Sequence, residues 1–310
     1  MTRAVRLAVP DLVSNSYFPA IAAVELGCFR EEGLTPKLEL IFPNFKAFEA
    51  LRAGKIDIVA APAHVALRVF PEGEGLKLLA ALAQGMFWVL VMRAKLRAKP
   101  GDVNAVRGRT IGAAPMVDLG LKHLLAEAGI DPERDVKIVG VEGMMEPGVS
   151  FGVAAAKALA EGQIDGFWAN AMGAETAVRS GVGKVILDVR RGLGPAVAAH
   201  YTFSALSTSE KAIERHPDIV DRSVRAVVKA QRLLKGIPRL ATDVGRKLFP
   251  PAEADVIADI IARDVAFYDA AISQDAIDGL NRFGTAMGLL KKPMAYENVV
   301  ATQFQGLWRG

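Results

Sequence analysis

The sequence predicts an α/β protein of two lobes, each with a mainly parallel sheet flanked by helices. Three observations indicate this class. Strand-like apolar segments alternate with helix-like segments over short loops, as in parallel βαβ units. A long apolar stretch at residues 80–93 interrupts the alternation, which then restarts until a return crossing at residues 192–206. Finally, GKIDIV at 54–59 and GQIDGFW at 162–168 occupy corresponding places in the two runs.

The first run of alternating strands and helices begins near the start of the sequence, and a glycine follows each of its first two expected helices. Its expected strands are Val5–Val9, Leu38–Phe42 and Ile56–Ala60, and its expected helices are Tyr17–Leu26, Phe45–Ala53 and one that begins at His64.

The second run follows the apolar stretch, which suits a buried strand or a pair of strands that crosses between lobes. Its expected strands are Thr110–Ala113, Val136–Gly140, Gly166–Ala169 and Lys184–Asp188, and its expected helices are Leu119–Ala128, Val153–Glu161 and Gly173–Ser180. The rest of the chain has the spacing of amphipathic helices. We therefore expect one lobe from residues 1–88 and 200–310 and a second, inserted lobe from residues 89–199.

Composition narrows the class of protein. A chain of 310 residues with 51% hydrophobic residues buries a large core. Its net charge of +4 comes from lysines and arginines interleaved with acidic residues, which argues against a nucleic-acid partner. A single cysteine, Cys28, excludes an intrachain disulfide.

The location of the protein depends on its natural start. No stretch reaches the length of a membrane span, and MTRAVRLAVPD enters a strand-like pattern without the apolar segment of a secretory signal. We expect a cytoplasmic protein if Met1 is the natural start, and a periplasmic one if a signal peptide has been removed.

Several motifs together carry a resemblance to a known family. They are Gly27-Cys28-Phe29, the segment Glu31–Leu34, LRAGKID at 51–57 and RGRTIG at 107–112. The sequence from about Ala4 to Ala205 resembles type II periplasmic binding proteins, specifically those for alkanesulfonate, taurine, nitrate and the thiamine pyrimidine. This resemblance implies a two-lobed fold with a ligand cleft between the lobes, a small-molecule ligand, no cofactor, and an ABC transporter permease as partner.

Candidate ligand contacts come from the loops at the carboxyl ends of the expected strands, where ligands of α/β proteins bind. These loops are rich in aromatic residues and methionine, which suits a small aromatic or heteroaromatic ligand, including an anionic one. Asp118 also fits a helix cap, and methionines also fill cores. The loops contribute Tyr17, Phe18, Asn44, His64, Phe87, Trp88, Met116, Asp118, Glu142, Met144, Met145, Phe151, Trp168, Asn170, His200 and Tyr201.

An enzyme on the same fold is the alternative: a decarboxylase, a hydrolase or a relative of the pyrimidine synthases. Those synthases carry a histidine near the place of His64, but with a lysine shortly before it and a cysteine-rich motif later. Here Val59–Ala63 precedes the histidine and Cys28 is the only cysteine. We therefore favour His64 as a ligand contact. In an enzyme it would be catalytic, with His200 or Glu142 as its acid–base partner.

Metal chemistry is not expected. The four histidines lack the spacing of metal ligands.

Overall fold

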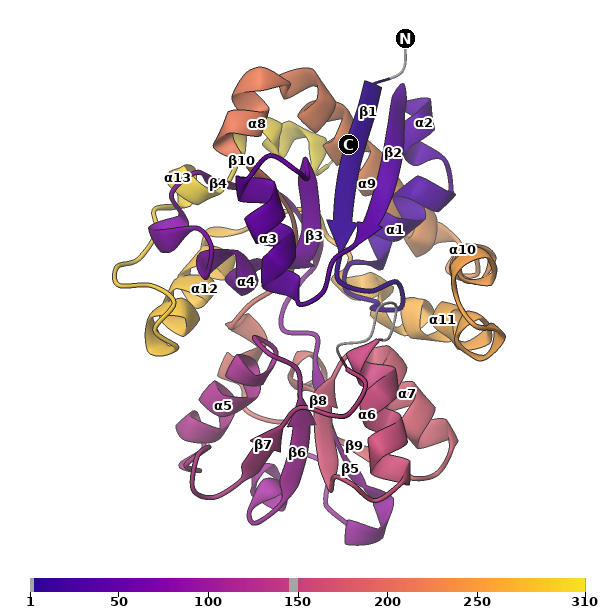
Figure 1. Ribbon diagram of the computed structural model, residues 1–310, viewed down its shortest axis with the longest axis vertical. Helices are drawn as coiled ribbons and strands as arrows, with labels where there is room; N and C mark the ends of the chain where they lie inside the picture. Colours follow the sequence, from indigo (N-terminus) through magenta and orange to yellow (C-terminus); the bar gives the residue numbers. More distant parts are fainter. Residues whose placement is uncertain (1–2, 145–149, 310) are drawn as a thin grey trace. The chain divides into compact units, whose positions relative to one another are not determined.

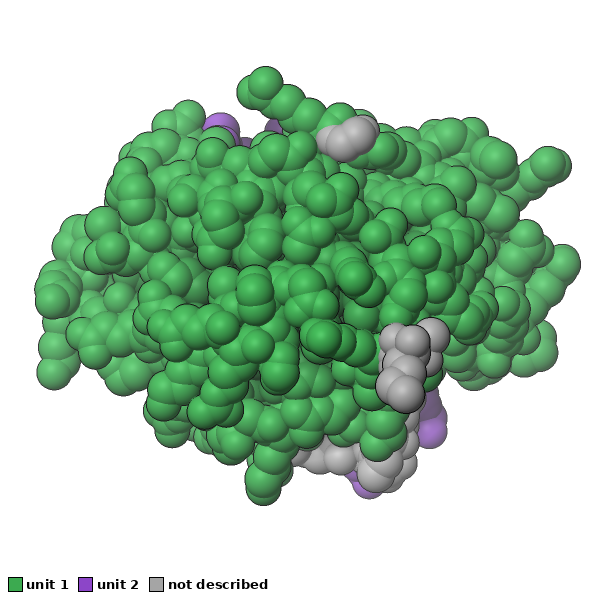
Figure 2. All heavy atoms as spheres, turned by 90° about the horizontal axis from the view of Figure 1, so that it is seen from above, with its two compact units in different colours: residues 1–85, 202–310 green, residues 86–201 purple. Residues whose placement is uncertain are grey.

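The chain forms two compact units in the computed structural model, which describes residues 3–144 and 150–309. Unit 1 comprises residues 1–85 and 202–310, and unit 2 comprises residues 86–201; Figure 2 colours them separately. The sequence places the first crossing after residue 88, whereas the compact units divide after Gly85, so that Phe87 and Trp88 belong to unit 2. No helix in the described ranges is both long and apolar enough to cross a membrane.

Unit 1 contains a five-stranded sheet of order β2-β1-β3-β10-β4 (Figure 1). Its strands are β1 (Arg3–Val9), β2 (Leu34–Leu40), β3 (Ile58–Pro62), β4 (Leu76–Ala83) and β10 (Ser204–Ser209). Strand β1 pairs in parallel with β2 and β3, as the sequence predicts, whereas β10 runs antiparallel to β3 and β4. All residues of β3 are buried, as expected of a central strand.

The second strand lies earlier in the chain than its apolar pattern suggests. We expected Leu38–Phe42, but β2 covers Leu34–Leu40 because all seven of its residues pair with Arg3–Val9. The amide of Ile41 still donates to the carbonyl of Val9 at 3.0 Å, but β1 ends there, and Phe42 leads into Pro43, which precedes α3. Tertiary pairing therefore outweighs local hydrophobicity at this edge strand.

Helices cover the unit 1 sheet, with α1, α2 and α9 in mutual contact and α3, α4 and α12 in a second group. The longest, α9, buries Val220, Val224, Val227 and Leu234, whose spacing places them on one helical face. The helices of unit 1 are α1 (Phe18–Glu25), α2 (Cys28–Glu31), α3 (Asn44–Arg52), α4 (Ala63–Leu67), α8 (Glu210–Arg215), α9 (Pro217–Gly236), α10 (Leu240–Leu248), α11 (Pro251–Asp264), α12 (Gln274–Ala286) and α13 (Tyr296–Val299).

Unit 2 repeats the architecture with a sheet of order β7-β6-β8-β5-β9. Strand β6 pairs in parallel with β7 and β8, and β5 runs antiparallel to β8 and β9. The elements are β5 (Val89–Arg93), β6 (Thr110–Ala113), α5 (Asp118–Glu127), β7 (Lys137–Val139), α6 (Phe151–Ala160), β8 (Gly166–Ala169), α7 (Ala171–Arg179) and β9 (Gly183–Leu187).

Each sheet is mixed rather than fully parallel because of its crossing strand. The apolar stretch at residues 80–93 contains the end of β4 and all of β5, separated by a loop, and the return segment ends in β10. Strands β5 and β10 enter their sheets from the edge at which the parallel strands end, so each runs antiparallel to its neighbours.

Helices α6 and α7 approach each other so closely that glycine is required at the contact. A Cβ atom on Gly173 would overlap the carbonyl group of Gly152, and one on Gly152 would lie 2.6 Å from Asn170 Oδ1. The first turns of the two helices therefore lie side by side, and α7 follows β8 directly (Figure 1).

Substitution of Gly173 by alanine tests this contact. We expect Gly173→Ala to lower the free energy of unfolding by about 2 kcal/mol, because backbone atoms must move apart to admit the methyl group. Gly236→Ala is the matched control, since Gly236 ends α9 and has open space around its Cα. That control should change stability by less than about 1 kcal/mol. Urea unfolding followed by circular dichroism measures both, and equal effects would refute the close contact.

Candidate functional site

The carboxyl edge of the unit 1 sheet gathers the loops that the sequence singles out. Because β1, β2 and β3 are parallel, the segments that follow them meet at one edge. Antiparallel β10 begins at this edge, which adds Thr202 and Phe203. The amide of Ala63 donates to the carbonyl of Phe203 at 2.9 Å and so ties the β3–α4 junction to β10.

His64 is fully buried in unit 1, at the start of α4. Its Nδ1 lies 3.1 Å from Thr202 Oγ1, and its ring meets the ring of Phe283 edge-on, with centroids 5.4 Å apart. The backbone amide of His64 also donates to Thr202 Oγ1, at 3.4 Å. The imidazole is thus held in one orientation by Phe283 of α12 and by the segment that precedes β10, and Thr202 is a positioning residue that sequence reasoning missed.

The loop after β1 is held by Asp11. Its carboxylate accepts hydrogen bonds from the amides of Val13 and Ser14, at 3.0 and 2.9 Å, and from the hydroxyl of Tyr17, at 2.5 Å. Burial raises the pKa of Asp11, and burial together with the Asp11 carboxylate raises the pKa of Tyr17. Tyr17 is a predicted ligand contact, but its hydroxyl donates to Asp11 and so helps to hold the loop after β1.

The same loop is anchored to the C-terminal third of the chain. Asn15, fully buried, donates from its side-chain amide to Asp264, the last residue of α11. The hydroxyl of Tyr268 donates to the carbonyl of Asn15 at 2.6 Å. Both partners are buried. The helical character of this third, visible in the sequence, did not indicate that it reaches the loop.

Two further predicted contacts of unit 1 lie in or beside its core. Phe18 is fully buried and packs edge-on against Phe249, with ring centroids 6.1 Å apart. Asn44 begins α3 and is 6% exposed. The packing of Phe18 against α10 explains its burial without a ligand.

Cys28 lies away from this edge. It begins α2, beyond the end of α1, and the chain then enters β2 beside the start of β1. The residue is buried, and desolvation raises the pKa of its thiol. A thiol with a raised pKa is a poor nucleophile near neutral pH.

The carboxyl edge of unit 2 contains two helix N-termini. Asn170 caps α7 by accepting from the amide of Gly173 at 3.2 Å. Ser150 precedes α6, is 7% exposed, and its Oγ has no hydrogen-bond partner among the described residues. The positive dipole ends of two adjacent helix N-termini favour an anion.

Aromatic residues surround the same edge of unit 2. Trp168 pairs with Ala113 at the end of β6, is fully buried, and its indole N–H has no partner among the described residues. Phe151 begins α6 and is 8% exposed. Phe87 and Trp88 pack together, with ring centroids 4.7 Å apart, and Gly120 of α5 admits the Trp88 ring. Unit 2 thus places anion-binding groups beside apolar walls.

The remaining predicted residues have separate roles or positions. Asp118 starts α5 and forms an ion pair with Lys122 at 3.4 Å. The ring of Tyr201 packs on that of His123, with centroids 4.6 Å apart, and its hydroxyl donates to Glu127. Burial, with the Glu127 carboxylate, raises the pKa of Tyr201. The other residues of the predicted set are Met116, buried after β6; His200 and Glu142, both exposed; Met144, half-buried; and Met145, outside the described residues.

Acid–base pairing of His64 with His200 or Glu142 would need side chains from both units, because His64 belongs to unit 1 and the others to unit 2. Within the described ranges, no group of three or more His, Cys, Asp or Glu side chains is placed to hold a metal ion.

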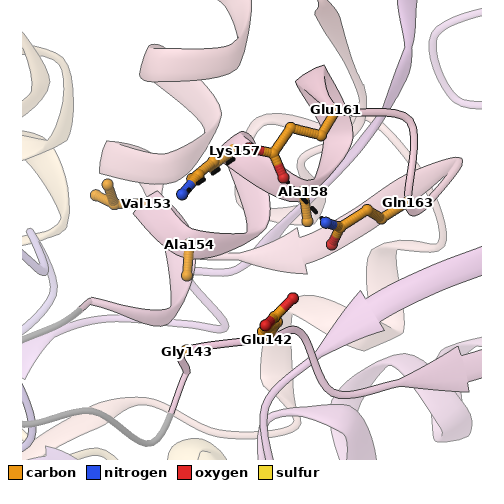
Figure 3. Close-up of a pocket in the computed structure, with 8 residues that line it drawn as sticks. All are labelled: Glu142, Gly143, Val153, Ala154, Lys157, Ala158, Glu161 and Gln163. Carbon is orange, nitrogen blue, oxygen red and sulfur yellow. Dashed lines mark hydrogen bonds and ion pairs between the residues drawn. The ribbon is translucent and has the colours of Figure 1, made fainter.

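A surface pocket of roughly 350 Å³ runs along α6 in unit 2 (Figure 3). Its polar groups already interact: Lys157 pairs with Glu161 at 3.9 Å, and Gln163 donates to Glu161 at 3.0 Å. Glu142 is the one predicted contact in its lining, which contains no aromatic residue. The lining residues are Glu142, Gly143, Val153, Ala154, Lys157, Ala158, Glu161 and Gln163.

The chain shares its fold with solved proteins of the periplasmic-binding type. A protein from Bordetella bronchiseptica RB50 is 18% identical with a TM-score of 0.76, covering 98% of this chain and 96% of that one. The alkanesulfonate-binding protein SsuA from Xanthomonas axonopodis pv. citri, bound to MOPS, is 15% identical with a TM-score of 0.71, covering 96% and 97%.

An enzyme shares the fold as well. A point mutant of DSZB in complex with biphenyl-2-sulfinic acid is 16% identical with a TM-score of 0.69, covering 99% of this chain and 98% of that one. No curated protein matches the sequence. The chain belongs to the NMT1-like family, whose model matches residues 2–244. The fold class and the family resemblance predicted from the sequence are confirmed.

The hydroxyl of Thr202 provides a test of the His64 environment. We expect Thr202→Val to lower the free energy of unfolding by about 1 to 3 kcal/mol, because the imidazole loses a buried partner. Thr176→Val, which removes the part-buried hydroxyl of a surface residue bonded to the Met172 carbonyl, should cost less than about 0.5 kcal/mol. Denaturant titration of both variants measures the difference, and a neutral Thr202→Val would contradict the proposed anchoring.

Proposed function

We propose that the protein is a solute-binding protein that captures a small aromatic or heteroaromatic anion for ABC-type import. The observation that carries the proposal is the pair of helix N-termini in unit 2. The Ser150 hydroxyl, which has no hydrogen-bond partner in the part of the chain that the structure describes, and the Asn170 cap lie there beside buried aromatic side chains. An anionic group would bind at the helix N-termini, and its ring would lie against the apolar walls.

The ligands of two structural neighbours support this chemistry. The SsuA structure contains MOPS and the DSZB structure contains biphenyl-2-sulfinic acid. Each of these molecules joins a ring to a sulfur oxyanion. The proposal extends the same combination to this chain, with an ABC permease as partner and the periplasm as location.

A ligand panel tests the proposal. Benzenesulfonate and nicotinate carry both a ring and a negative charge, methanesulfonate carries the charge alone, and benzyl alcohol carries the ring alone. We expect isothermal titration calorimetry to rank the two aromatic anions tightest. Binding of benzyl alcohol as tightly as benzenesulfonate would overturn the anionic part of the proposal.

Ser150 provides the site-specific prediction. Ser150→Ala should weaken benzenesulfonate binding about five- to tenfold, because an anion loses one buried hydrogen-bond donor. Ser180→Ala is the matched control, since Ser180 lies at the far end of α7 and bonds to the Thr176 carbonyl. The control should leave affinity unchanged. Equal affinities for both variants would exclude the α6 N-terminus.

An enzyme remains the second candidate, favoured by the likeness to DSZB. Cys28 does not support a thiol mechanism, because the residue is buried and lies by the start of β1. Prolonged incubation of the protein with its tightest panel ligand, followed by mass spectrometry, separates the two functions. A binder returns the ligand intact, whereas an enzyme yields a product.

A further inference from the structure

We propose that Met116 gives the unit 2 site its preference for ligands with a flat apolar group. This inference rests on the proposed function and adds a specificity residue to it. Met116 follows β6 directly after Pro115 and is 6% exposed. Its φ is +71°, in the left-handed region that side chains other than glycine and asparagine rarely adopt.

The local turn demands this conformation. Ala114 accepts from the amide of Asp118 at 2.9 Å, so the chain reverses through Pro115, Met116 and Val117 before α5 begins. A residue of positive φ after a proline is ordinarily glycine or asparagine, because a Cβ atom there is strained. Met116 therefore has a large side chain at a position where the backbone conformation favours glycine.

Met116 differs from the other non-glycine residues of positive φ. Among the described residues, only Glu72 and Arg97 are other non-glycine residues with positive φ. Glu72 has a visible structural role, since its carboxylate accepts from the amides of Lys291 and Lys292 at 3.1 Å each. Arg97 is exposed and ends a short 3-10 helix after β5. Met116 alone combines the strained backbone with a buried apolar side chain.

The role of the Met116 side chain follows from its place at the carboxyl edge of the unit 2 sheet. Ala113 pairs with Trp168, so the Met116 turn and Asn170 follow neighbouring strands at the same sheet edge. The thioether is flexible and polarizable, and it packs well against aromatic rings. Strained residues persist where the site requires them. Met116 thus provides an apolar wall for the ring of a ligand whose anionic group binds at α6 and α7.

The test compares two ligands in three variants. Wild type should bind benzenesulfonate more tightly than methanesulfonate. Met116→Gly should lower the ratio of these affinities about 5- to 20-fold, with methanesulfonate affinity unchanged within about twofold, because only the apolar contact is lost. Met116→Leu should retain the ratio within about threefold. Arg97→Gly is the matched control, since it relieves a positive φ at the opposite edge of the sheet, and should leave both affinities unchanged.

Stability provides a second readout. Because glycine relieves the strain and alanine retains it, Met116→Gly should melt about 2 to 4 °C above Met116→Ala. An unchanged affinity ratio in Met116→Gly, or a parallel loss of methanesulfonate binding, would overturn the specificity role while the proposed function stands. A wild-type protein that binds neither the two sulfonates nor nicotinate would refute the proposed function, and this inference with it.

Discussion

Unit 1 depends on the hydrogen bonding of β10 to both β3 and β4. Those two strands are not paired with each other, so the sheet is continuous only because a strand that follows unit 2 in sequence lies between them. The residues just before this strand, Thr202 and Phe203, contact the β3–α4 junction, where His64 is held. Insertion of a second unit into the chain is thus compatible with one cooperative core in unit 1, and the segment that leads into the completing strand also orients His64.

The two units contribute different chemistry to their carboxyl edges. Unit 1 presents half-buried Asp11 and buried Asn15, His64 and Asp264, each engaged with other protein groups. Unit 2 has two adjacent helix N-termini, with buried polar atoms of Ser150 and Trp168 that lack a hydrogen-bond partner among the described residues; unit 1 has such atoms too, in Ser204 and Ser207 of β10. Unsatisfied buried groups cost stability and are expected where a ligand completes them. The adjacent N-termini of α6 and α7 are therefore why the proposal places the anionic group of the ligand in unit 2.

Local pattern predicted most of the elements and only part of the site. Strands such as Thr110–Ala113 and Gly166–Ala169 agree with β6 and β8, because their apolar residues and turn signals are adjacent in sequence. The shift of β2 and the antiparallel crossing strands follow from pairing, which a local pattern does not contain. The contact of Asn15 with Asp264 joins residues 249 positions apart, and the glycine contact between α6 and α7 depends on packing. The ligand contacts themselves stay a prediction.

The anchoring of the β1–α1 loop has a consequence for the order of folding. The loop is synthesised within the first twenty residues, but Asp264 and Tyr268, which fix Asn15, emerge from the ribosome some 250 residues later. Contacts of such long sequence separation form late, because the intervening chain must first be ordered. A nascent chain can therefore have a nearly complete unit 2 while its first loop still lacks its final conformation, which is fixed only after α11 has been synthesised.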